Sequence, residues 1–433
     1  MRQVEDVFAD TLGGTALAPP RPQTPCAPRR EAIARLATEA GLRRVHLLAW
    51  RDLEDAEAGG SEVHASTIAR HWADAGVDVT IRTSAAAGLP AVVDRDGYRV
   101  VRRAGRYAVF PRAVAAGTLG RGGRPDGLVE VWNGMPFFSP MWARVPRVTF
   151  LHHVHAEMWD MALTQPTLAR LGRTIEFAIA PPLYRRSRIV TLSASSREEI
   201  IARLGLPGTN ITVVPPGVDP RFSPGGRRSS TPLIAAVGRL VPVKRFDVLI
   251  DILVELRTRH PALQAVIAGE GYEHGALGAR IAAAGATEWI HLPGRLSDAD
   301  LVLLYRRAWV VASTSAREGW GMTLTEAAAC ATPGVASAIA GHTDAVAHGV
   351  SGLLADDPGQ LREALDAVIG DPVLRRRLSR GALARSSELT WEATAHGAMG
   401  ALADEAHRRG ARGPNPPPTR PGLRLAPRRA GDL

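Results

Sequence analysis

Short apolar runs that alternate with helical stretches are the feature that most constrains the fold of this chain. Residues 43–50 (RRVHLLAW) suit a strand buried on both faces, because such strands carry continuous rather than alternating apolar residues. A helical stretch over residues 61–76 ends at a glycine, and residues 77–84 read as the next strand. This strand–helix–strand order indicates a βαβ unit with parallel strands.

The pattern continues in two series with a break between them. Further strands of the first series are expected at residues 127–132, 147–152, 188–193 and 211–217. The break at Pro224, Gly225 and Gly226 indicates a linker. The second series starts at residue 232 and leads to a long last helix that begins near Trp391.

We therefore expect the α/β class, with two tandem Rossmann-like, doubly wound domains at residues 43–222 and 231–410. Ligands of such sheets bind at the carboxyl ends of the strands, so two facing domains place a small-molecule site in the cleft between them. Residues 1–42 and 411–433 are rich in Pro, Ala and Arg, which predicts a flexible arm and a disordered basic tail.

Composition predicts a soluble protein of a reducing compartment. Cys26 and Cys330 lie in unlike contexts and suggest neither a disulfide framework nor a zinc site. The apolar runs are all shorter than the ~18 residues of a membrane span, and the first ten residues lack the apolar core of a secretory signal. We expect a cytoplasmic location.

The net charge of +10 raises two further classes of partner. Almost every cation is an arginine on a helix face or in a tail, and aromatic residues make up only 5%, so few are free to stack on bases. We do not expect a nucleic-acid partner. Peripheral contact with the anionic inner face of the cell membrane stays open, because each basic residue near such a surface gains about 1 kcal/mol.

The chain contains a single lysine, Lys244, inside the segment GRLVPVK that directly follows an expected strand. Gly238 lets the backbone turn, Arg239 presents a planar fork, and Lys244 adds a compact charge. Together they suit a diphosphate. A solvated surface loop is the alternative, and the position of the only lysine in this segment favours the binding site.

The segment EGWGMTLTE joins another expected strand to a helix and carries Glu318 and Glu326, eight positions apart. The amino end of a helix offers free N–H groups to a phosphate. Glu326 suits ribose hydroxyls, as acids do in dinucleotide-binding folds, and Glu318 suits the hydroxyls of a sugar. Either acid alone could be a cap or a surface carboxylate, but the spaced pair with its two glycines favours a site.

With these motifs, residues 43–410 resemble the retaining GT-B glycosyltransferases of family 4, also called group 1. That family has an E-x7-E motif before a C-G-T-P-type turn, and a G-R-L…K motif that opens the second domain. The chain carries EGWGMTLTEAAACATP and VGRLVPVK in the family's order and separation. GEG (269–271), VVPPGVD (213–219) and the glycine loop GGSE (59–62) also lie at family-like places.

The resemblance implies that the first domain binds the acceptor and the second domain binds a UDP-, GDP- or ADP-linked sugar. Arg239 and Lys244 would bind the donor diphosphate, Glu318 the transferred sugar and Glu326 the ribose. The expected donor-binding set is Gly238, Gly269, Gly319, Gly321, Met322, Thr323 and Glu326. The set expected to line the acceptor side is Gly59, Gly60, Glu62, Asn133 and His153.

His152, His153 and His155 follow an expected strand of the first domain. In similar enzymes a histidine at a strand end contacts the donor sugar, so His152 is the fourth expected catalytic residue, with Arg239, Lys244 and Glu318. A structural role for His153 and His155 is the alternative. Three histidines within four positions could suggest a metal site, but no acid or cysteine partner accompanies them. We therefore expect no bound metal.

The implied reaction is metal-independent and needs no cofactor, since the nucleotide sugar is a co-substrate. A hexose-type sugar would move, with its anomeric configuration kept, to an unidentified glycan, lipid-linked glycan or small molecule. A nucleotide-sugar epimerase of the same fold is the enzyme alternative, and a basic nucleic-acid-binding protein is the non-enzyme alternative. A pyridoxal-phosphate-dependent phosphorylase is disfavoured, because the only lysine lies in the phosphate loop.

Two other motifs give little support for a functional site. Asp94-Arg95-Asp96 has the D-x-D form of a metal site, but an Asp-Gly pair follows within an alternating run, which favours a hairpin. GEGYEHG lacks the G-x-G-x-x-G spacing of a nicotinamide site. The chain also departs from the family at Ala331 and at Pro333-Gly334, and the acid expected in a later donor loop is Asp344.

Overall fold

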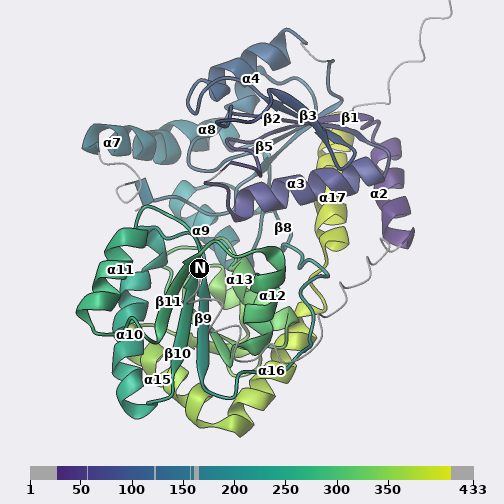
Figure 1. Ribbon diagram of the computed structural model, residues 1–433. Coiled ribbons are helices and arrows are strands. Elements are labelled where there is room, and N and C mark those ends of the chain that lie inside the picture. The colour runs from purple at the N-terminus through teal and green to yellow at the C-terminus, as the bar shows by residue number, and fades with distance from the viewer. Residues whose placement is uncertain (1–26, 56, 121–122, 157, 160–164, 411–433) are drawn as a thin grey trace, which may run out of the picture.

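A computed structural model describes residues 27–55, 57–120, 123–156, 158–159 and 165–410, which form two α/β domains (Figure 1). Each domain is built on one sheet with helices packed against it. The two-domain architecture of parallel sheets that the apolar runs predict is confirmed.

The first sheet has eight strands in the order β3-β4-β2-β1-β5-β6-β7-β8. Every neighbouring pair is parallel except β3 and β4, which form a hairpin. Asp96 and Gly97 both have positive φ at its turn, the conformation that favours Asp-Gly. The strands are β1 (Arg44–Leu48), β2 (Asp78–Thr83), β3 (Val92–Arg95), β4 (Tyr98–Arg102), β5 (Gly127–Val131), β6 (Arg147–Phe150), β7 (Arg188–Thr191) and β8 (Ile211–Val213).

Helices of the first domain connect these strands and cover the sheet. They are α2 (Ala27–Glu39), α3 (Gly60–Asp74), α4 (Val109–Thr118), α5 (Ser139–Trp142), α7 (Pro166–Thr174), the π-helical turn η1 (Ile175–Ile179), α8 (Ala180–Tyr184), α9 (Ala194–Leu204) and the 3₁₀ turn η2 (Gly208–Asn210). Helix α2 lies inside the segment expected to be a flexible arm, so that prediction is wrong for residues 27–39. Residues 1–26 and 411–433 lie outside the described part of the chain.

The second sheet has six parallel strands in the order β11-β10-β9-β12-β13-β14. They are β9 (Leu233–Val237), β10 (Gln264–Ala268), β11 (Ile290–Gly294), β12 (Val310–Ser313), β13 (Gly334–Ser337) and β14 (Gly352–Ala355). The helices are the 3₁₀ turn η3 (Pro242–Lys244), α10 (Phe246–Arg259), α11 (His274–Ala283), α12 (Asp298–Arg307), α13 (Met322–Ala329), α14 (His342–Ala345), α15 (Pro358–Gly370), α16 (Pro372–Ser386) and α17 (Trp391–Arg408).

Helix α17 follows the second sheet in the chain but packs on the first domain, beside α2 and α3 (Figure 1). Trp72 Nε1 on α3 donates to the carbonyl of Ala395 at 2.9 Å. Met399 and Leu402 of α17 are buried in the same core as Val45 of β1. The expected domain of residues 231–410 therefore loses its last helix to the first domain, because the apolar stripe of α17 fits the face that α2 and α3 leave uncovered.

Candidate functional site between the domains

Two loops of the second domain meet at Gly238 and Gly269, each directly after a strand. The amide of Gly238 donates to the carbonyl of Ala268 at 3.0 Å. Gly269 has φ +148°, and a Cβ there would lie 1.8 Å from the carbonyl oxygen of Gly238. Only glycine lets the two loops pass so closely. The glycines predicted in the donor set therefore have a clear structural role in shaping the loop that carries Arg239 and Lys244.

Lys244 and Glu318 form an ion pair beneath this loop, and each side chain is 18% exposed. Ser315 Oγ also donates to Glu318 at 2.9 Å. Burial opposes ionisation, but the Lys244 ammonium outweighs it and lowers the pKa of Glu318 to about 2. The acid predicted to bind the sugar is therefore fully ionised and is held by the cation predicted to bind the diphosphate.

Helix α13 begins beside this pair. Gly321, at φ +100°, is its N-cap, and no side chain caps the helix. The first-turn residues Met322 and Thr323 therefore offer backbone N–H groups at a positive dipole end. One turn later, burial raises the pKa of Glu326 to about 7, although its bond from Tyr305 Oη at 3.2 Å favours the charged form.

Four of the residues predicted to line the acceptor side, all except His153, gather around the amino end of α3 in the first domain. The amide of Gly59 donates to Glu62 Oε2 at 2.8 Å, so this carboxylate caps the helix from within. Asn133, on the loop after β5, donates from Nδ2 to Ser61 Oγ at 3.2 Å. These two bonds fix the glycine loop to the sheet.

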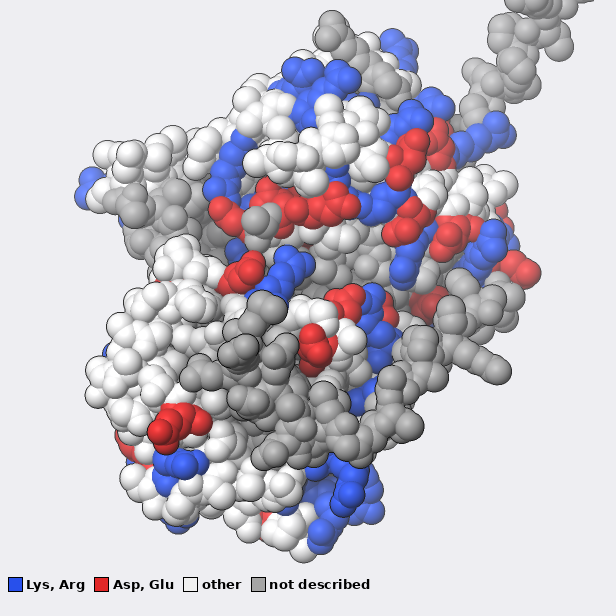
Figure 2. Space-filling view, in the orientation of Figure 1, with Lys and Arg blue, Asp and Glu red and all other residues white. Residues whose placement is uncertain are grey.

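The two domains touch at these helix ends. A Cβ at Gly59 would lie 3.3 Å from Arg239 Nε, and a Cβ at Gly60 would lie 3.2 Å from Met322 Sδ. The amino ends of α3 and α13 thus approach each other, with Arg239 beside them. Acidic and basic side chains also lie close together along the side of the first domain that faces the second (Figure 2). An anionic ligand is the natural partner of the uncapped amino end of α13 with a lysine and an arginine beside it.

The histidines after β6 are divided between two environments. The ring of His152 packs against that of His64 at 4.8 Å between centroids, and His152 is buried in the first domain. Burial lowers its pKa well below the ordinary value. His152 meets the second domain through its backbone, since a Cβ at Gly319 would lie 2.8 Å from its carbonyl oxygen. The structure therefore does not bring the His152 ring to the Lys244–Glu318 pair.

His153 is the histidine whose pKa is affected by the charged residues at the domain junction. Burial lowers its pKa to about 4, and the charges of Glu318 and Arg239 also act on it. Its ring stacks on that of His155 at 4.9 Å. The sequence could have distinguished the two histidines, because side chains alternate between the two faces of a strand. By this alternation His152 lies on the same face as the core residue Phe150, and His153 lies on the other face.

Asp344, the acid of the later donor-domain loop, makes its side-chain contacts with the first domain. Its carboxylate accepts hydrogen bonds from the amides of Ala194 at 2.9 Å and Ser195 at 3.2 Å, and from Ser195 Oγ. These groups form the amino end of α9 in the first domain. Asp344 therefore joins the two domains. Sequence reasoning missed this contact, as it missed the cluster of Trp50, Arg51 and Arg106 around Glu57.

Among the described residues, no group of three or more His, Cys, Asp and Glu side chains is arranged to hold a metal ion. The D-x-D residues lie on the β3–β4 hairpin, where Asp94 pairs with Arg99 and Arg95 pairs with Asp52. The described helices also include none whose length and apolar character would allow it to cross a bilayer.

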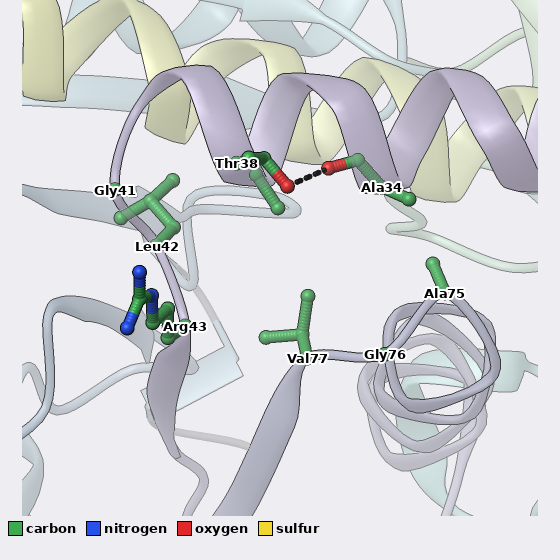
Figure 3. Close-up of a pocket in the computed structure, with 9 residues that line it drawn as sticks. Ala34, Thr38, Gly41, Leu42, Arg43, Ala75, Gly76 and Val77 are labelled. Atoms are coloured by element: carbon green, nitrogen blue, oxygen red, sulfur yellow. Dashed lines mark hydrogen bonds between the residues drawn. The ribbon is translucent and has the colours of Figure 1, made fainter. Parts of the chain in front are cut away.

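A separate cavity of about 240 Å³ lies at the opposite, amino-terminal ends of β1 and β2, between α2 and the end of α3 (Figure 3). It is lined by Ala34, Ala37, Thr38, Gly41, Leu42, Arg43, Ala75, Gly76 and Val77. Arg43 is the one charged residue in this lining. The cavity lies away from the residues at the domain junction and brings no group of catalytic type together.

Comparison with known proteins agrees with this geometry. The model of "Glycosyltransferase Family 4" matches residues 58–222, and that of "Glycosyl transferases group 1" matches residues 220–385. A D-inositol 3-phosphate glycosyltransferase of Stackebrandtia nassauensis is 31% identical over 403 residues, which cover 82% of this chain and 88% of the relative.

Solved structures share the fold. Sucrose-phosphate synthase from Thermosynechococcus elongatus superposes with a TM-score of 0.69 at 18% identity, covering 82% of this chain and 96% of that one. HepE from Anabaena, in complex with UDP and glucose, gives 0.64 at 19% identity, covering 82% and 97%. The chain therefore belongs to the group 1, family 4 glycosyltransferases and is an enzyme of the GT-B fold.

Proposed function

We propose that this enzyme transfers a hexose-type sugar, with retention of configuration, from a nucleoside-diphosphate donor to a phosphorylated polyol or a related phosphorylated acceptor. The observation that carries the proposal is the Lys244–Glu318 pair between Arg239 and the uncapped amino end of α13. Support for the donor comes from HepE, which binds UDP and glucose. Support for the acceptor comes from relatives named for inositol 3-phosphate.

In this proposal the donor diphosphate lies between Arg239, Lys244 and the first amides of α13. Lys244 then exchanges part of its contact with Glu318 for the phosphate, and the freed carboxylate accepts hydrogen bonds from the sugar. Glu326 accepts bonds from the ribose hydroxyls. The two cations and the helix end supply the charge stabilisation that a metal ion supplies elsewhere, so the reaction needs neither metal nor cofactor.

Charge develops on the leaving diphosphate as the bond to the sugar breaks. Arg239, Lys244 and the helix end stabilise this charge, and the leaving phosphate oxygen takes the proton from the acceptor hydroxyl. Because the acceptor then enters on the face from which the phosphate leaves, the anomeric configuration is kept. This step needs no protein carboxylate as nucleophile.

The test is calorimetric titration with UDP, GDP and ADP in metal-free buffer. We expect one nucleotide to bind with a micromolar dissociation constant to the wild type and not to Lys244→Ala. Turnover of Lys244→Ala should fall by about 10²-fold or more, the scale of losing one such stabilising group. Arg280→Ala, which removes an exposed arginine of α11, is the matched control and should bind like the wild type.

Equal nucleotide binding by Lys244→Ala and the wild type, with circular dichroism unchanged, contradicts the donor site. Formation of an epimerised nucleotide sugar in the absence of any acceptor would instead favour the epimerase.

A further inference from the structure

A tryptophan with two arginines stands at the carboxyl end of β1, on the first-domain side of the junction. The guanidinium of Arg51 lies 4.3 Å from the centroid of the Trp50 ring, and that of Arg106 lies 5.2 Å from it. The indole Nε1 donates to the carbonyl of Arg106 at 2.7 Å. This bond ties the loop after β4 to the end of β1, so both guanidinium groups are held in place by one rigid ring.

Arg51 is a charge with incomplete hydrogen bonding. Its side chain is only 10% exposed. Nη1 donates to the carbonyl of Glu57 at 2.7 Å, and Nη2 lies 3.6 Å from the carboxylate of the same residue. Nε is buried and has no hydrogen-bond partner among the described residues. A buried guanidinium with an unused N–H group is costly unless another acceptor completes it.

The carboxylate of Glu57 lies between the two arginines and is weakly held. Arg106 also pairs with the Glu57 carboxylate, whose side chain is 55% exposed. An ion pair as exposed as this contributes little to stability. Glu57 therefore shows where a carboxylate or phosphate oxygen fits, and a stronger anion can replace it.

The position of Arg51 and Arg106 indicates which substrate they would contact. The charges of Arg239 and Glu62 both act on the pKa of Arg51. Arg51 therefore lies close to the junction and to the amino end of α3. A Cβ at Gly59 would lie 3.3 Å from Arg239 Nε, which places the glycine loop between the two domains. The pair belongs to the first domain, across the junction from Lys244.

We propose that Arg51 and Arg106 bind the phosphoryl group of the acceptor, which displaces Glu57 and directs the acceptor hydroxyl toward the donor sugar. This inference rests on the proposed transfer reaction. Two planar forks suit the several oxygens of a phosphoryl group. A soluble polyol phosphate and a lipid-linked phosphate offer the same group.

The test measures the binding of inorganic phosphate to enzyme saturated with its nucleotide, so that the diphosphate site is filled. We expect saturable binding that Arg106→Gln weakens by about tenfold or more, because a charged hydrogen bond is lost. Arg99→Gln, which removes an exposed arginine of β4, should bind phosphate like the wild type. Glu57→Gln should bind phosphate more tightly than the wild type, since it removes the competing carboxylate.

Competition then distinguishes the source of the phosphoryl group. Displacement of the phosphate by D-inositol 3-phosphate, but not by inositol, indicates a soluble acceptor. Displacement by vesicles containing a polyprenyl phosphate indicates a lipid carrier. Equal phosphate binding by the wild type and Arg106→Gln, or none by either, overturns the subsite, since any phosphate bound would be an adventitious ion only.

Failure of the donor proposal is separable from failure of this one. Lys244→Ala lacks the proposed diphosphate site, so phosphate bound by that variant and lost in Lys244→Ala/Arg106→Gln supports the subsite even if no nucleotide binds. If nucleotide binds normally and the phosphate experiment fails, the subsite is wrong and the transfer reaction stands. Arg106 is 43% exposed, so its replacement does not disturb a core.

Discussion

At the level of single residues, Lys244 and Glu318 depend on each other. Both side chains are largely buried, so removal of either partner leaves the other as an uncompensated charge in a poorly solvated place. In the proposed function, the donor diphosphate replaces Glu318 as the partner of Lys244, and the sugar hydroxyls replace Lys244 as the partner of Glu318. The pair itself therefore carries no net charge while no donor is bound.

His64 is a second residue whose environment has a measurable consequence. Both ring nitrogens are buried and have no hydrogen-bond partner within the described part of the chain. Burial lowers its pKa to about 3, from an ordinary value of 6.5. The ring is packed among those of Phe150, His152 and Trp391. The folded protein therefore accommodates the neutral ring and resists its protonation.

Acid should destabilise the fold through this histidine. Because the folded-state pKa is below the unfolded one, the stabilisation is present above pH 6.5 and is lost as the pH falls toward 3. Between pH 7 and 5 the loss from one such group is about 2 kcal/mol. His64→Phe should therefore show a smaller fall in melting temperature over this interval, measured by calorimetry. The exposed His274→Phe is the control, and equal falls in all three proteins would contradict the explanation.

At the level of elements, α17 decides how the two domains are joined. The chain passes from the first domain to the second and back again, and the two crossings lie side by side, with a bridge between Val218 and Thr390. A Cβ at Gly217 would lie 2.2 Å from the amide nitrogen of Trp391. The start of α17 is thus packed directly on the first crossing, and the helix completes the core of the first domain.

Substitutions in α17 should weaken the first domain and leave the second intact. Leu402 is fully buried there, and Leu402→Ala should cost about 2–5 kcal/mol through the cavity it leaves. Hydrogen exchange should then speed up in β1 and β5 but not in β9 and β10. Leu378→Ala, at an equally buried position of α16 in the second core, should give the reverse pattern. Equal exchange changes in both sheets would argue against this assignment.

At the level of the whole molecule, Asp344 holds the domains together at the junction. Its carboxylate caps α9 of the first domain, and its own carbonyl accepts a bond from Arg385 of α16. A second contact joins Arg317 of the second domain to Glu199 of α9. Charged contacts at a helix end depend on geometry, so they form only when the domains have approached.

Loss of this contact should favour an open arrangement. Asp344→Ala removes hydrogen bonds to a charged group worth about 1.5–3 kcal/mol each, which shifts the balance by about tenfold or more. We expect a larger radius of gyration in solution scattering and a raised KM for the donor sugar. Asp247→Ala, on the exposed start of α10, is the control. Scattering and kinetics identical to those of the wild type would show that other contacts hold the domains.

The amino-acid sequence by itself determined the two strand–helix series, the linker between them and the glycine turns at Gly238 and Gly321. These features are local, because an apolar run, a glycine turn or a helix start is written in adjacent residues. The tertiary structure alone decided the domain that α17 joins, the histidine on which the charge of Glu318 acts, and the partners of Asp344 and Arg51. Each of these depends on segments far apart in the chain, and both sheets offer an apolar face that local patterns cannot tell apart.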